Sequence, residues 1–150
     1  MTQLKGEARE VALAEAQAVL AMARDDEMRG RLGELVGQVE EGAVDGAATE
    51  LLEQVLELGL QTGRIRAYYG PGGEQAAVKT LRRLPRGRAR SDSARDVSAA
   101  LAALAGRTLD RVAIAAVGPG SYTLSIQADG FETSVRLDGS GARLQSVATA

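Results

Sequence analysis

The residues best suited to chemistry lie in a glycine-rich turn and in the basic helix expected after it. Residues 70–75 read Gly-Pro-Gly-Gly-Glu-Gln. Backbone N–H groups at a helix N-terminus bind anions, so this turn could hold a phosphate group. The spacing matches neither a P-loop nor a dinucleotide-binding fingerprint. The candidate anion-binding residues are Gly72, Gly73, Lys79, Arg82 and Arg83.

A purely structural turn is the alternative interpretation of this segment. Glu74 brings a negative charge to the position that the anion would take. An acidic residue in the first turn instead stabilises a helix through its dipole. We expect the structural role to prevail.

Basic residues gather between residues 61 and 95, where nine of them stand against two acids. Within this block, Tyr68 and Tyr69 precede a run of arginines that could neutralise phosphates while the tyrosines stack on bases. The run consists of Arg82, Arg83, Arg86, Arg88 and Arg90. Residues 1–60 carry thirteen acids and five bases, so the two blocks nearly cancel. The arginines could therefore pair with the acidic block of their own chain or of a second copy. We expect this pairing, because the acidic excess repels a polyanion.

Catalytic and metal-binding residue types are scarce. The chain contains neither His nor Cys, which removes the commonest general base, the thiolate nucleophile and the commonest transition-metal ligands. Acidic pairs such as Asp25-Asp26 fall at expected helix ends. We therefore expect a non-catalytic protein without a cofactor or metal ion. An enzymatic role would require a pocket near Tyr68, Tyr69 and Lys79.

Hydrophobic periodicity predicts helices across the first 62 residues. Residues 6–24 form the first, and a second begins at the acids of residues 25–27 and reaches about residue 41. Asp45 is suited to cap a third, over residues 46–61, whose broad apolar face needs another region or subunit to cover it. The predicted interaction residues are Leu51, Leu52, Val55 and Leu58, together with Arg86, Arg88 and Arg90 from the basic segment.

The middle of the chain is predicted to separate two regions. Residues 64–73 are expected to form a short strand and a turn, and residues 74–84 a helix that ends before Pro85. Residues 86–92 are polar and basic without large apolar side chains, which indicates a mobile linker. The expected organisation is a mainly helical region at 1–85, a basic linker at 86–92, and a helix with a four-stranded sheet at 93–150.

Turn signals predict an antiparallel meander after a helix over residues 93–105. They occur at residues 118–120, 129–130 and 138–141. Asp-Gly favours a two-residue hairpin, which sets Leu124 opposite Val135, and the preceding loop sets Ile114 opposite Leu124. The third turn sets Leu144 opposite Val135, and every register places apolar residues on one face. The fold class is therefore α+β, with an N-terminal helical hairpin or three-helix region, then a helix packed on a four-stranded meander.

These patterns predict a non-catalytic protein–protein interaction or assembly module that self-associates through its N-terminal helices. Its partner would be a second copy or another protein. The alternative is anion or nucleic-acid binding through residues 64–90. The sequence shows neither a secretory signal nor an apolar run long enough for a membrane span, so we expect a cytoplasmic protein without a membrane partner.

Overall fold

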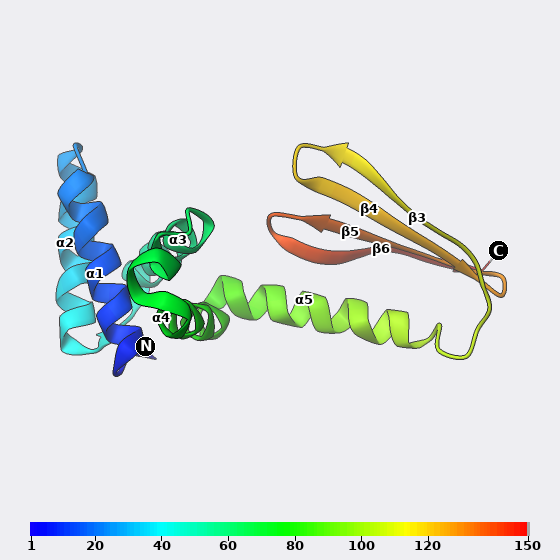
Figure 1. Cartoon of the computed structure of the whole chain (residues 1–150), viewed down its shortest axis with the longest axis horizontal. Helices are drawn as coiled ribbons and strands as arrows, with labels where there is room; N and C mark the ends of the chain where they lie inside the picture. Colours follow the sequence, from blue (N-terminus) through cyan, green and yellow to red (C-terminus); the bar gives the residue numbers. More distant parts are fainter. Residues whose placement is uncertain (150) are drawn as a thin grey trace. The chain divides into compact units, whose positions relative to one another are not determined.

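A computed structural model describes residues 1–149 and confirms the α+β class (Figure 1). The chain divides into two compact units, one formed by Met1–Arg88 and the other by the residues from Ala89 onward. The first unit is a helical bundle, and the second contains a four-stranded antiparallel sheet.

The first unit consists of four helices and a small two-stranded sheet. The predicted N-terminal helices are confirmed, whereas the pairing of the two short strands was not predicted. Asp25 accepts a hydrogen bond from the backbone N–H of Met28 at 2.8 Å, as expected for an N-cap residue. The elements are β1 (Thr2–Gln3), α1 (Glu7–Met22), α2 (Asp26–Glu41), β2 (Ala43–Val44), α3 (Gly46–Gln61) and α4 (Arg64–Arg83).

The core of this unit is aliphatic, as the shortage of aromatic residues requires. Every helix of the bundle contributes to one continuous cluster of buried residues. The largest fully buried apolar side chains are Leu32, Leu35, Leu52, Leu56, Ile65 and Leu84. Burial of these side chains is the main favourable contribution to the stability of the bundle.

The prediction of a strand over residues 64–70 is wrong, because these residues form the first half of α4. Ile65 and Tyr69, four residues apart, lie on the same side of the helix and pack against the core. The predicted turn is present as a kink inside α4, where Gly70 has a φ of 67° and Pro71 follows. A φ of this sign suits glycine, which carries no Cβ.

The prediction that residues 86–92 lack regular structure is also wrong. They belong to α5 (Pro85–Ala102), which begins eight residues before the predicted start at residue 93. Proline suits the first position of a helix, because that N–H has no intrahelical partner. The division between the units falls between Arg88 and Ala89, inside this helix.

The second unit contains the predicted meander in the order β3-β4-β5-β6. The predicted pairs Ile114–Leu124, Leu124–Val135 and Val135–Leu144 are all present. From α5, the Ser93 hydroxyl donates a hydrogen bond to the carbonyl of Ala142 at 2.8 Å, and Val97 is buried. The strands are β3 (Leu109–Gly118), β4 (Ser121–Ala128), β5 (Phe131–Asp138) and β6 (Gly141–Thr149).

Candidate functional site

The apolar face of α3 is covered within one chain. Leu51, Leu52 and Val55, which were predicted to contact a second subunit, are buried among the helices of the first unit. The other helices of the bundle supply the cover that the sequence left unassigned. Leu58 alone of the four predicted contact residues is exposed, at 48%.

Leu58 lines a shallow apolar hollow of about 300 Å³ on the first unit. Its walls come from the end of α1, the start of α2 and the middle of α3. Apart from Gln54 the lining is apolar: Val19, Met22, Ala23, Met28, Leu32, Leu51, Val55 and Leu58. The chemistry of this hollow is that of a hydrophobic contact, with no group placed for catalysis.

The structure separates the predicted anion-binding residues. Gly72, Lys79 and Arg83 line one polar hollow of about 320 Å³, together with Lys5 and Thr80. Arg82 lines a different hollow, which Lys79 also borders. Gly73 is buried, and a Cβ built on it would lie 2.3 Å from the Cβ of Tyr69, so this glycine serves close packing.

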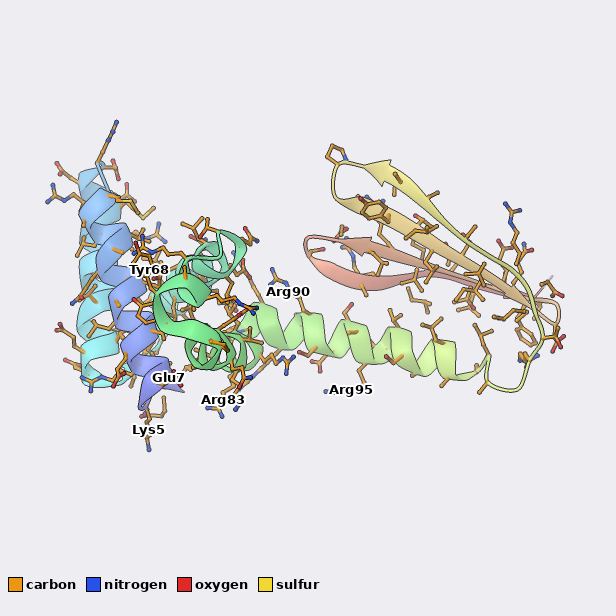
Figure 2. All side chains as sticks on the ribbon, in the orientation of Figure 1. Lys5, Glu7, Tyr68, Arg83, Arg90 and Arg95 are labelled. Carbon is orange, nitrogen blue, oxygen red and sulfur yellow. The ribbon has the colours of Figure 1, made fainter. Side chains whose placement is uncertain are left out.

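A carboxylate from α1 lies where the anion was predicted to bind. A Cβ added to Gly72 would lie 2.9 Å from Glu7 Oε1, which places the carboxylate against the helical segment that starts after the kink. Glu7, Lys5 and Arg83 gather at the same end of the first unit (Figure 2). An incoming phosphate would meet the negative charge of Glu7 beside the three cations of this hollow, Lys5, Lys79 and Arg83. The arrangement therefore favours a structural role for the turn.

Two arginines of the basic segment pair with acids of the N-terminal block. Arg64 Nε lies 3.2 Å from Glu15 Oε1, and Arg86 Nε lies 3.8 Å from Glu53 Oε2. Both glutamates are almost fully buried. Sequence reasoning missed these buried carboxylates, because a glutamate in a helix is ordinarily expected to face solvent.

The arginines predicted to bind an anion or a partner differ in exposure. Arg82, Arg83, Arg86 and Arg88 are exposed, whereas Arg90 is half-buried. Arg66 forms an ion pair of 3.3 Å with Glu74 inside α4. The segment is thus a mixture of paired and solvent-facing cations rather than a single basic surface.

The two tyrosines do not form a joint stacking platform. Tyr68 is exposed, and the Arg64 guanidinium lies 5.5 Å from the centroid of its ring. Tyr69 is half-buried against the core. Burial, followed by the nearby Glu15 carboxylate, raises the pKa of the Tyr69 hydroxyl, which keeps this hydroxyl protonated.

Most of the large apolar side chains that are exposed in residues 1–149 belong to the strands of the sheet. The register puts Val112 beside Ile126, Ile114 beside Leu124, and Val147 beside Thr133, so all six share one face. On the central strands Thr133, Val135 and Ala128 are buried, but the side chains of the outer strands are not. The exposed large apolar residues of this unit are Leu109, Val112, Ile114, Val117, Tyr122, Leu144 and Val147.

The opposite face of the sheet is polar and internally bonded. Arg136 Nη2 donates to the Ser121 hydroxyl at 2.9 Å, and Ser134 lies 3.4 Å from Gln145 Oε1. Asp138 accepts hydrogen bonds from the backbone N–H and hydroxyl of Ser140 at 2.9 and 2.5 Å. These bonds, and then Arg143, lower the pKa of the Asp138 carboxyl to about 2.

Within residues 1–149 no group of three or more acidic side chains is placed to hold a metal ion. None of the helices in this range is both long and apolar enough to cross a lipid bilayer. The chain matches no protein-family model, and no curated protein or solved structure is significantly similar to it.

Proposed function

We propose that this chain is a non-catalytic assembly module that self-associates through its C-terminal unit. The observation that carries the proposal is the uncovered apolar face at both outer strands of the sheet. Val112 is 54% exposed, Ile114 63% and Val147 57%. Large apolar side chains exposed on one face of a sheet are typical of interaction sites in soluble proteins.

The composition of this face favours a second copy as the partner. The face is built from β3 residues 112, 114 and 116 and from their cross-strand partners on β4, β5 and β6. None of the residues paired across this face, from Val112 on β3 to Val147 on β6, has a charged side chain. A contact across a two-fold axis brings a surface against itself, so a charged side chain close to the axis would face its own copy. A charge-free face avoids this repulsion.

The position of the contact differs from the one that the sequence indicated. Helix 46–61 was expected to supply it, but its apolar face is already packed in the first unit. The sheet offers more exposed large apolar residues than α3, which exposes Leu58 alone. The C-terminal unit is therefore the better supported surface.

Sedimentation velocity of the full chain, from low micromolar to several hundred micromolar, tests this function. We expect a shift from one chain to a defined larger species as concentration rises. Leu58→Lys, in the apolar hollow of the first unit, is the matched control and should leave this shift unchanged. A single-chain mass at every concentration would refute the proposal.

Anion binding is the second candidate, supported by the polar hollow that Lys5, Lys79 and Arg83 share. Glu7 lines the same hollow and weighs against it. Titration with inorganic phosphate, followed by NMR shifts of the Lys79 and Thr80 amides, would test this candidate. Saturable shifts that are lost in Lys79→Gln would support phosphate binding. If the wild-type chain shows no such shifts, assembly remains the sole candidate function.

A further inference from the structure

Strand β3 has the composition of a central strand although it lies at the edge of its sheet. Its residues 112–117 read Val-Ala-Ile-Ala-Ala-Val, a run without a charge, a proline or a hydrogen-bonding side chain. Such continuous apolar runs are typical of strands flanked on both sides and covered on both faces. Within residues 1–149, however, β3 is hydrogen-bonded to β4 only.

The other edge of the sheet is protected against further pairing. Strand β6 carries Arg143, Gln145 and Ser146, and its register with β5 shifts between Ser134 and Val135. Charged side chains and bulges are the usual means by which proteins prevent an edge strand from pairing with another chain. The register of β3 with β4 shifts only near the ends of the strand, after Leu109 and after Ala116, and stays regular between Arg111 and Ala116. The two edges therefore differ in their readiness to accept a strand.

We propose that β3 pairs edge to edge with the β3 of a second copy, antiparallel, so that the two meanders form one continuous sheet. This inference rests on the proposed self-association through the C-terminal unit and places the contact at the edge of β3, the strand that carries Val112 and Ile114. A strand that pairs with its own copy across a two-fold axis runs antiparallel to it. The pairing satisfies backbone groups that β3 otherwise leaves to solvent.

The uncharged run limits where the two-fold axis can pass. In an antiparallel pair, opposed residues share a face, so the residue on the axis must oppose its own copy. With Ile114 on the axis, Val112 opposes Ala116 of the second copy. With Ala115 on the axis, Ile114 opposes Ala116. Either register sets uncharged residues against one another across the centre of the contact.

Cysteine cross-linking tests the pairing directly, because the natural chain contains no cysteine. Single variants Ala113→Cys, Ile114→Cys and Ala115→Cys are oxidised under native conditions, with Val147→Cys on β6 as the control. We expect rapid disulfide-linked dimers from the one position on the axis, because only its two Cβ atoms come within disulfide range. Val147→Cys should cross-link no faster under native conditions than the same variant does in denaturant, where chains meet only by random collision.

Charge substitution gives an independent readout in the full chain. Ile114→Lys places two ammonium groups near each other across the contact and should raise the dissociation constant about tenfold or more, since opposed like charges destabilise strand pairs. Leu58→Lys, an exposed apolar site on the first unit and outside the proposed contact, should have a much smaller effect. Circular dichroism and urea unfolding establish that both variants are folded. If Ile114→Lys is not folded, Ala115→Lys takes its place.

The outcomes separate this inference from the proposed function. If the chain self-associates but Val147→Cys cross-links as fast as the β3 variants, the edge pairing is refuted and assembly stands. The same conclusion follows if Ile114→Lys and Ala115→Lys associate as the wild type does. A wild-type chain that stays single at all concentrations refutes both.

Discussion

The buried carboxylate of Glu53 accepts a hydrogen bond from the backbone N–H of Arg86, with 2.7 Å between Oε1 and the nitrogen. Glu53 lies in α3 and is 0% exposed, whereas Arg86 is the second residue of α5. The first N–H groups of a helix have no partner inside it, and a carboxylate there also interacts favourably with the helix dipole. Glu53 therefore fixes where α5 begins.

Replacing Glu53 should destabilise the first unit. We expect Glu53→Ala to lower the free energy of unfolding by about 2 kcal/mol, because it leaves the Arg86 N–H without an acceptor and opens a cavity. Arg86→Ala keeps the backbone N–H and should cost less. Urea unfolding followed by circular dichroism measures both, with Glu50→Ala on the exposed side of α3 as control. Equal losses for Glu53→Ala and Glu50→Ala would contradict this role.

A close contact at Gly59 yields a second prediction. A Cβ on this residue of α3 would lie 2.8 Å from Glu15 Oε2 and 2.8 Å from Ile65 Cδ1, so Gly59→Ala should destabilise the unit by about 1–3 kcal/mol. Gly37→Ala in α2 meets no atom within 4 Å and should instead stabilise the unit, by up to about 1 kcal/mol, through helix propensity. Thermal unfolding of the pair should give shifts of opposite sign.

Acid should weaken the β5–β6 turn. The pKa of Asp138 is lowered to about 2, so its ionised form stabilises the folded state above the unfolded carboxyl pKa, about 4. This contribution is lost as the pH falls from about 4 towards 2. Carboxyl NMR titration should give the lowered pKa directly, and Ser140→Ala should raise it. A stability profile for Asp138→Asn that declines as steeply in this range as that of wild type would contradict the assignment.

Limited proteolysis should cut first within the early part of α5. Among the described residues between Leu84 and Val97 none is buried, so this stretch of helix can open locally without exposing core. Trypsin is expected to cleave after Arg88 or Arg90 and to leave two folded fragments, identified by mass spectrometry. First cleavage after Arg107 or Arg136 would place the boundary elsewhere.

Nucleic acid should bind feebly at physiological salt. Arg64 and Arg86 are paired within the chain, and the acidic block repels polyanions. Genuine binding through five arginines would give a log–log salt slope of about −4 to −5 for duplex DNA. Submicromolar affinity for random DNA that is lost when all five arginines are changed to Gln would overturn this expectation. The five are Arg82, Arg83, Arg86, Arg88 and Arg90.

The meander could be predicted residue by residue because its signals are local. Asp129-Gly130 fixes one hairpin, and the alternation of apolar residues on either side fixes its register. Asp129 takes the positive φ, 45°, that this turn requires. Three such turns in succession left little freedom in the order of the strands.

The errors arose where distant residues decide the local structure. Residues 64–70 contain apolar groups in several spacings, and only the bundle core selects the helix that buries Ile65. Residues 86–92 lack an apolar stripe. The start of their helix is held instead by the Glu53 carboxylate, which accepts from the backbone N–H of Arg86, thirty-three positions away in the sequence. Burial of the α3 face depended likewise on the packing of four helices, which spacing alone does not determine.

The strand order β3-β4-β5-β6 has a kinetic consequence. Every strand pairs with its sequence neighbour across a short turn, so each loop that closes is small and its entropic cost is low. The bundle, in contrast, must bring Thr2 to Val44 and α1 to α4. During synthesis the apolar run of β3 would therefore find its β4 neighbour soon after both emerge, which shortens the interval in which it can be captured by another nascent chain.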